Sequence, residues 1–285
     1  MTSAASRVLS GKAIAAKHLE RIAEEVRQLQ KKGACLSLGS VQVGDSKDVG
    51  LYSKAIEQLF KKLGIRYVAK VFGSTLAQNE LYRQILKLNA DPDISAILLF
   101  SPLPAHIDAV SILNAIDLLK DVEGRRVLHG VGDRVLSPTA AAVMALLEET
   151  GCDLKGKDAV VVGRSDVVGK PCAILLLDKR ATVTVCHSST KNLKACIEKA
   201  DVVVATVGKP HLIKGEWIKP GAIVIDVGEN LVDGKLVGDV EFETAKERAG
   251  FISPVPGGVG PVTNLMLVRN LITLHRLRET ANGNR

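Results

Sequence analysis

The chain contains the segment Val161-Val162-Gly163-Arg164-Ser165-Asp166-Val167-Val168-Gly169-Lys170-Pro171. An apolar strand leads directly into one glycine, and a second glycine precedes a helix with proline in its first turn, where the missing N–H costs nothing. This arrangement predicts free backbone N–H groups and a helix N-terminus, which favour a bound diphosphate. The spacing matches the Gly-x-Gly-x-x-Gly fingerprint only loosely, so these residues alone are equally typical of a tight structural turn.

The strand after this loop favours NADP over NAD. In dinucleotide-binding folds the end of this strand lies beside the adenosine ribose, where NAD enzymes carry Asp or Glu. Here the strand ends Cys186-His187-Ser188-Ser189-Thr190, without an acid. The hydroxyl groups and Arg164 suit a 2′-phosphate. His187 alone is more typical of a capping or packing residue than of a catalyst.

Helix and strand patterns alternate along almost the whole chain, which predicts an α/β protein with mainly parallel sheets. Before the loop, the periodicity predicts helices over residues 11–32, 49–63, 76–88 and 139–150 and strands over 35–43, 66–72 and 95–101. Within and after the loop region, it predicts strands over 159–162, 182–186, 202–207 and 223–227, a hairpin turn at Asp233-Gly234, and a last helix over 262–277.

Composition is that of a globular chain of one or two domains, with 46% hydrophobic and 24% charged residues among 285. The apolar runs are far shorter than the ~20 residues of a membrane span. Residues 1–10 lack the apolar core of a secretory signal, although their Ser/Ala content leaves a transit peptide as an alternative. We therefore expect a cytoplasmic protein without a membrane partner.

Cysteine and charge patterns argue against metal and nucleic acid. The five cysteines stand singly, without Cys-x-x-Cys or histidine at zinc-ligand spacing, so we expect no metal site and no disulfide. The net charge of +7 is spread along a chain with only 3% aromatic residues, which argues against nucleic acid as a partner. A polyanionic small ligand also fits this charge, but a plain basic surface without a partner is more typical of an excess this small.

The chain also carries a collinear set of short motifs. They are Leu9-Ser10-Gly11-Lys12-Ala13-Ile14-Ala15, Val43-Gly44, Tyr52, Leu63-Gly64-Ile65, Pro102-Leu103-Pro104, Lys120-Asp121-Val122, Gly163-Arg164-Ser165, Val168-Gly169-Lys170-Pro171, Thr182-Val183-Thr184-Val185-Cys186-His187-Ser188, Ala200-Asp201, Gly221-Ala222-Ile223-Val224-Ile225-Asp226-Val227-Gly228 and Pro254-Val255-Pro256-Gly257-Gly258-Val259-Gly260-Pro261-Val262-Thr263. Together they closely resemble the FolD family of bifunctional methylenetetrahydrofolate dehydrogenase/methenyltetrahydrofolate cyclohydrolases.

The resemblance implies a two-domain α/β fold and a homodimer. Residues 1–138 with 264–285 would form a folate-binding catalytic domain with a parallel sheet, and residues 139–263 a Rossmann-like NAD(P)-binding domain. It further implies a folate cleft between the domains and a last helix that returns to the first of them.

The resemblance also assigns site residues. The cofactor-binding residues would be Gly163, Arg164, Ser165 and Ser188, joined by Glu229, which stands where the family has a small or apolar residue. The substrate-binding residues would be Tyr52, Phe100, Pro102, Leu103, Glu123, Pro256, Gly257, Gly258 and Pro261, of which Tyr52 and Glu123 are the catalytic candidates.

Three departures from the family pattern affect the folate side. The family's lysine position is occupied by Ile56. Its Gln-Leu-Pro-Leu-Pro reads Phe100-Ser101-Pro102-Leu103-Pro104, so Phe100 replaces the glutamine, and its Asp-Gly-Phe-His-Pro reads Glu123-Gly124-Arg125-Arg126-Val127. Lys54 is a poor substitute for the lysine, because two residues along a helix turn it about 200° away from Tyr52.

These residues favour NADP-dependent oxidation of 5,10-methylenetetrahydrofolate, with NAD less favoured and cyclohydrolase activity weak or absent. Hydride transfer needs positioning and electrostatics, whereas ring hydrolysis needs a positioned acid or base to move protons. The alternatives are a fully bifunctional enzyme, an enzyme for another pterin or one-carbon carrier, and a nucleotide-binding pseudoenzyme.

Overall fold

The computed structural model describes residues 7–125 and 135–283 of the chain. They divide into two compact units. The first unit consists of Met1–Leu19 with Ser137–Met266, and the second of Glu20–Leu136 with Leu267–Arg285. Two long helices, α1 (Gly11–Lys31) and α9 (Val259–Gly283), each contribute residues to both units.

The first unit is built on a six-stranded sheet in the order β1-β11-β8-β7-β5-β6, parallel throughout. The strands are β1 (Arg7–Val8), β5 (Asp158–Val162), β6 (Thr182–Cys186), β7 (Val202–Ala205), β8 (Ile223–Asp226) and β11 (Phe251–Ile252). The central strands consist almost entirely of valine, isoleucine and alanine and are buried on both faces, as parallel strands between two helical layers are. This confirms the predicted Rossmann-like α/β class.

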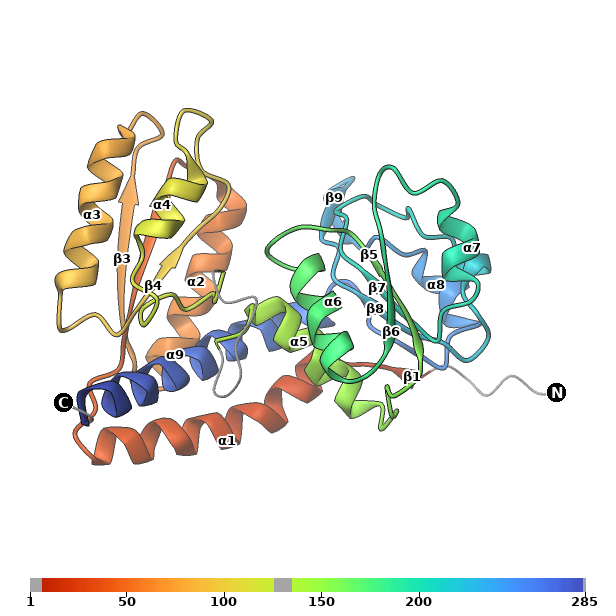
Figure 1. The fold of residues 1–285 in the computed structure, drawn as a ribbon, viewed down its shortest axis with the longest axis horizontal. Helices are drawn as coiled ribbons and strands as arrows, with labels where there is room; N and C mark the ends of the chain where they lie inside the picture. Colours follow the sequence, from red (N-terminus) through yellow and green to blue (C-terminus); the bar gives the residue numbers. More distant parts are fainter. Residues whose placement is uncertain (1–6, 126–134, 284–285) are drawn as a thin grey trace. The chain divides into compact units, whose positions relative to one another are not determined.

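Alternate residues of these strands supply two separate cores. Val161 and Val204 pack with residues of α5 (Pro138–Glu149) and α6 (Gly169–Asp178) on one face. Val162 and Val203 pack with residues of α7 (Leu193–Ile197) and α8 (Phe242–Lys246) on the other. Figure 1 shows α6 on one side of the strands and α7 with α8 on the opposite side. The helices and strands after β5 are therefore wound onto both faces of the sheet.

Smaller elements complete the first unit. A one-turn 3₁₀ helix spans Gly215–Trp217, and a hairpin joins β9 (Asn230–Val232) to β10 (Lys235–Val237). Its turn residues Asp233 and Gly234 have φ angles of 49° and 75°, which is the geometry that makes Asp-Gly favourable in tight hairpins. The predicted hairpin is therefore confirmed.

Two buried carboxylates fix the loops that follow β7 and β8. Asp239 accepts hydrogen bonds from the backbone N–H groups of residues 207, 208 and 209 at 2.6, 3.0 and 2.8 Å. Asp226, the last residue of β8, accepts from the N–H groups of residues 228, 239 and 240 at 2.9, 3.1 and 2.9 Å. Because a buried carboxylate must be hydrogen-bonded, these loops are held in one conformation.

The second unit contains a three-stranded parallel sheet in the order β3-β2-β4. Its elements are β2 (Ser37–Val43), α2 (Lys47–Lys62), β3 (Arg66–Phe72), α3 (Gln78–Ala90), β4 (Ala96–Leu99) and α4 (Ala109–Ala115). Asp121 forms an isolated parallel bridge with Ile97 beside β4. Asn270 of α9 donates to the carbonyls of Val122 and Leu136, both at 2.7 Å, so this helix anchors the segment after the bridge.

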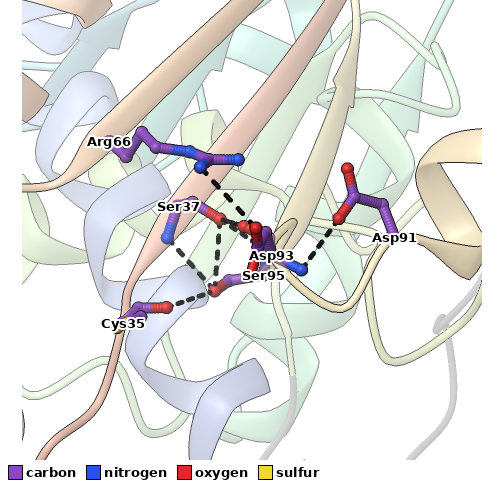
Figure 2. Close-up of polar contacts among 6 residues, drawn as sticks. All are labelled: Cys35, Ser37, Arg66, Asp91, Asp93 and Ser95. Atoms are coloured by element: carbon purple, nitrogen blue, oxygen red, sulfur yellow. Dashed lines mark hydrogen bonds and ion pairs between the residues drawn. The ribbon is translucent and has the colours of Figure 1, made fainter.

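A reciprocal pair of serines joins the amino ends of β2 and β4, as Figure 2 shows. The N–H of Ser37 donates to Ser95 Oγ at 3.1 Å, and the N–H of Ser95 donates to Ser37 Oγ at 2.9 Å. Ser37 Oγ also donates to the carbonyl of Asp93, whose carboxylate lies 3.9 Å from the Arg66 guanidinium. These contacts fix the amino ends of the strands, while ligand sites in open parallel sheets lie at the carboxyl ends.

The predicted elements agree with the structure except at their ends and in short pieces. The helix predicted over 262–277 spans Val259–Gly283, and the strand predicted over 95–101 contains only Ala96–Leu99. Helix α4 and strands β1 and β11 are too short for a clear periodicity and were not predicted. The family resemblance places residues 1–138 in the folate-binding domain, whereas Arg7 and Val8 pair with β11 in the sheet of the first unit.

Asp226 makes the stability of the protein depend on pH. Burial raises the pKa of its carboxyl group from 3.8 to about 6, against the opposing effect of three backbone hydrogen bonds. Between these values the folded state keeps a proton that the unfolded state loses, so the free energy of unfolding falls as pH rises from about 4 to about 6. The contribution is on the order of 3 kcal/mol.

Chemical denaturation across this pH range measures the effect. Asp226→Asn should remove this component of the slope, whatever its effect on absolute stability. A carboxyl-carbon NMR titration of the wild-type protein reports the same pKa without a variant. An Asp226 titration near its ordinary value, or identical slopes for the two proteins, would contradict the prediction.

Candidate functional site

The candidate residues of the first unit follow the carboxyl ends of β5, β6 and β8. Strand β5 is flanked by β6 on one side and β7 on the other, so the chain direction across the sheet reverses here, where open parallel sheets bind ligands. The N–H of Gly163 donates to the carbonyl of Cys186 at 2.9 Å, and the N–H of Thr206 donates to that of Val162 at 2.8 Å. The loops after three neighbouring strands therefore start side by side.

Gly163 and Gly169 permit a backbone contact that no larger residue allows. Gly163 has φ of 125°, and a Cβ on it would lie 2.2 Å from Thr206 Oγ1. A Cβ on Gly169, the first residue of α6, would lie 2.3 Å from the carbonyl oxygen of Gly163. The two glycines thus bring the start of α6 against the end of β5, as the sequence predicts for this turn.

Ser165 occupies backbone N–H groups at the start of α6 that the sequence predicts to be free. Its Oγ accepts from the N–H groups of Val168 and Gly169 at 3.2 and 3.3 Å, and its carbonyl accepts from Lys170 N at 3.0 Å. The prediction of free N–H donors at this helix N-terminus is therefore wrong for these three groups, because the Ser165 side chain caps two of them and its backbone carbonyl accepts from the third. Arg164 and Ser165 themselves are exposed.

The loop after β6 exposes hydroxyl groups and is shaped by His187. The Nδ1 atom of the His187 ring accepts from the backbone N–H of Ser189 at 3.2 Å, and the backbone N–H of His187 donates to Thr190 Oγ1 at 2.9 Å. His187 is thus a capping residue, as its sequence context indicates. Ser188 is exposed, and the adjoining β5 turn carries the exposed Arg164. A cation and hydroxyl groups without a carboxylate in the loop suit a phosphate group.

Glu229 and the glycine-rich loop lie at the start of α9. A Cβ on Gly260 would lie 3.2 Å from Glu229 Oε1, so the carboxyl group is beside the first turn of this helix. Partial burial of the Glu229 carboxyl group raises its pKa, although the residue as a whole is exposed. In the loop, Gly257 has φ of 99° and accepts from Gly11 N at 2.9 Å.

The loop residues assigned to the substrate differ in exposure. Pro256 is exposed, Gly257 and Pro261 are half-buried, and Gly258 is buried. A Cβ on Gly258 would lie 2.5 Å from the carbonyl oxygen of Pro254. These four residues belong to the first unit, whereas the remaining substrate candidates belong to the second.

In the second unit, α2 and the end of β4 form an apolar cluster around Tyr52. Tyr52 and Ile56 are one helical turn apart on α2, with 37% and 0% of their surfaces exposed. Phe100, which is 6% exposed, meets the Tyr52 ring edge-on at 5.9 Å between ring centroids. The pair that replaces the family's lysine and glutamine is thus buried and apolar. Lys54 is exposed, in agreement with its predicted position around the helix.

Glu123 is held in an ion pair. Its Oε2 lies 2.5 Å from Arg125 Nη2, and the two side chains are 16% and 12% exposed. Arg125 Nη1 donates to Ser101 Oγ at 3.2 Å, and Nη2 also donates to the carbonyl of Leu99 at 3.3 Å. Burial raises the pKa of Glu123, and the Arg125 charge opposes this effect. Pro102 is exposed and Leu103 packs on the core of the second unit.

Sequence reasoning gave no role to Ser101, Asp121 or Arg125. Asp121 is 5% exposed, and its carboxylate accepts from the N–H groups of Glu123 and Arg125 at 3.2 and 3.0 Å. An arginine in place of an aromatic residue was the available signal, because a guanidinium needs partners wherever it is buried. The accompanying substitutions at residues 126 and 127 lie outside the described residues.

Neither a metal-binding group nor a membrane-spanning helix is found among residues 7–125 and 135–283. There, no group of three or more His, Cys, Asp or Glu is arranged to hold a metal ion. None of the helices in the same ranges combines the length and apolar character of a membrane span.

Comparison with known proteins assigns both parts of the chain to one family. Residues 9–123 match the catalytic domain of tetrahydrofolate dehydrogenase/cyclohydrolase, and residues 137–279 match its NAD(P)-binding domain. The bifunctional protein FolD 2 of Geobacter metallireducens is 46% identical over 286 aligned residues, which cover 98% of this chain and 100% of that protein.

Solved structures agree. The bifunctional FolD enzyme of Campylobacter jejuni superposes with a TM-score of 0.93 at 38% identity, over 96% of this chain and 100% of that one. The Trypanosoma brucei enzyme, solved with NADP and an inhibitor, gives a TM-score of 0.91 at 36% identity, over 96% and 99% of the two chains. The chain therefore belongs to the tetrahydrofolate dehydrogenase/cyclohydrolase (FolD) family of two-domain, NAD(P)-binding enzymes.

Proposed function

We propose that this protein is an NADP-dependent 5,10-methylenetetrahydrofolate dehydrogenase of one-carbon metabolism whose cyclohydrolase activity is weak or absent. One observation carries the second half of this proposal. Both positions where the family has lysine and glutamine are buried and apolar, with Ile56 fully covered and Phe100 against Tyr52. The nucleotide half of the chain, by contrast, keeps the glycine turn, Arg164 and Ser188.

The two activities make different demands on this pocket. Oxidation removes a hydride from the methylene carbon and leaves a cation spread over the two flanking nitrogens, without abstraction of a proton. Such a step depends on positioning and electrostatics. Hydrolysis adds water to the cation and then opens the ring, which requires a group that moves protons. Ile56 and Phe100 have no such group to offer.

The residues divide between the two ligands. We assign the turn Gly163–Ser165 and Ser188 to NADP, with Arg164 facing the 2′-phosphate and Glu229 near the nicotinamide ribose. NADP supplies the acceptor for the hydride. We assign Tyr52 to stacking on the folate and Glu123 to accepting hydrogen bonds from the pterin ring. Phe100, Pro102, Leu103 and the loop residues Pro256, Gly257, Gly258 and Pro261 would line the substrate.

Full bifunctionality is the second candidate, since the Geobacter metallireducens and Campylobacter jejuni relatives carry that name. It requires a proton-transfer group other than the family's lysine. The same assay separates it from the pseudoenzyme and from an enzyme for another pterin. A homodimer and a cytoplasmic location stay predictions from the sequence and the resemblance.

An absorbance assay tests the proposal directly. With 5,10-methylenetetrahydrofolate and NADP, we expect reduced nicotinamide and methenyltetrahydrofolate to accumulate together, with slower turnover for NAD. Methenyltetrahydrofolate added alone should decay no faster than in a protein-free control. Hydrolysis at a rate that matches the dehydrogenase would establish the bifunctional alternative, and nucleotide binding without turnover would favour the pseudoenzyme or a different substrate.

Restoring the family's polar pair should restore hydrolysis. We expect the double variant Ile56→Lys/Phe100→Gln to hydrolyse methenyltetrahydrofolate at least about tenfold faster than the wild type, because general acid–base groups contribute about 10²–10⁴-fold. Ile56→Lys alone should gain less, since a buried lysine without a partner loses its proton. The apolar control Ile56→Met/Phe100→Leu should gain nothing. A folded double variant with no added hydrolysis would refute this account of the pocket.

Arg164 should determine the preference for NADP. Arg164→Ala should raise the KM for NADP about 10- to 100-fold and change the KM for NAD much less, because a charge-assisted hydrogen bond to phosphate contributes about 1.5–3 kcal/mol. The matched control is Lys155→Ala, which removes an exposed cation near the amino end of β5. Equal losses for both dinucleotides would place Arg164 away from the 2′-phosphate.

A further inference from the structure

The ion pair of Glu123 and Arg125 is nearly buried and built from a very short segment. Gly124 between them has φ of 58°, and a Cβ on it would lie 2.2 Å from the carbonyl oxygen of Val135. Asp121 holds the N–H groups of both neighbours of Gly124. The turn is therefore fixed at both ends, and the two side chains are held beside one another.

The Glu123–Arg125 ion pair is not explained by a contribution to the stability of the fold. Buried ion pairs contribute little net stability, because the loss of hydration offsets most of the attraction. In addition, Arg125 Nε is buried and has no hydrogen-bond partner within residues 7–125 and 135–283. An unmade hydrogen bond of this kind is unfavourable, and each case in a folded protein calls for an explanation.

The contacts of the guanidinium all favour one arrangement of Glu123. Nη2 holds the Glu123 carboxylate, while Ser101 Oγ and the carbonyl of Leu99 fix the guanidinium from the end of β4. Ser101, Glu123 and Arg125 are also positions at which this chain departs from the family pattern. Three separate departures thus form one connected set of polar contacts.

We propose that Arg125 is a positioning residue that keeps Glu123 ionised and oriented to accept hydrogen bonds from the pterin ring, with Ser101 fixing the guanidinium. This inference rests on the proposed function, since it assumes a folate substrate. A pterin offers N–H donors along one edge, and an ionised carboxylate is an acceptor only, whereas a protonated one turns one oxygen into a donor.

The electrostatics of the turn support this role. Burial raises the pKa of Glu123, the neighbouring Asp121 raises it further, and Arg125 is the group that lowers it. Among residues 7–125 and 135–283, the charge that acts on this carboxyl group besides Arg125 is the negative charge of Asp121. Burial without a counter-ion favours the neutral form of a carboxyl group, so Glu123 in a variant without Arg125 takes up a proton at a higher pH than in the wild type.

Calorimetric titration with folate between about pH 6 and pH 8 tests the inference. We expect wild-type affinity to change less than about threefold over this range. Arg125→Met should bind folate at least about tenfold more weakly at the acidic end and recover most of that loss at the alkaline end. Arg125→Lys, which keeps the charge, should keep the wild-type pH profile, and Glu123→Gln should bind weakly at every pH.

Two further variants complete the design. Ser101→Ala should show a smaller change than Arg125→Met with the same pH dependence, and it provides the test if Arg125→Met does not fold. Arg83→Met removes an arginine from an exposed ion pair with Glu80 in the same unit and should behave as the wild type.

The possible outcomes are distinct. A loss in Arg125→Met that is equal at every pH, or no loss, would overturn the positioning role while leaving folate binding intact. Failure of the wild type to bind folate at any pH, with NADP binding retained, would instead overturn the proposed function and this inference with it.

Discussion

The parallel pairing of β5 with β6 and β7 is the constraint on which the first unit depends. Because all three strands run in one direction, their carboxyl ends meet at one edge, and the loops that follow start from adjacent hydrogen bonds. Residue 163, directly after β5 at this edge, must be glycine, because Thr206 occupies the space that a side chain would need. The Asp226 and Asp239 carboxylates fix the loops after β8 and β7 by accepting hydrogen bonds from the backbone N–H groups of these loops. The same edge is therefore both rigid and rich in exposed polar groups.

In the second unit, the positively charged side chain stands at a different position from the lysine of the family pattern. Ile56 and Phe100 remove a cation and an amide from the surroundings of Tyr52, and Arg125 places a cation beside Glu123. This cation is paired with Glu123, and the two residues at the family's lysine and glutamine positions are buried and apolar.

Much of this could be predicted from the sequence, for identifiable physical reasons. The period of apolar residues predicts the long helices and buried strands, and Asp233-Gly234 predicts its hairpin because both residues must adopt positive φ. The sequence favours a capping or packing role for His187 over a catalytic one, and the structure shows the capping role. Strands β1 and β11 were missed because two residues carry no periodicity, and their pairing depends on segments more than 240 residues apart.

The remaining features depend on contacts that no local pattern encodes. Ser165 is a short polar residue in a loop, and only the structure reveals that it caps the N–H groups predicted to be free. Arg125 is similar, since its partner Ser101 lies 24 residues earlier in the chain and is an unremarkable serine by itself. Motif comparison identified the positions that differ from the family but treated each one separately. The structure joins Ser101, Glu123 and Arg125 through hydrogen bonds.

That connection bears on the chemistry proposed for the pocket. Loss of a hydride makes the substrate more positive, and a free cation beside it would oppose this change. A lysine able to move protons is such a cation whenever it is protonated. Here Ile56 contributes no charge and the charge of Arg125 is balanced by Glu123. The second unit thus presents Glu123, the acceptor we propose for the pterin ring, without a positive charge at the family's lysine position. This electrostatic arrangement is the basis on which we propose oxidation of the methylene group without efficient hydrolysis of the product.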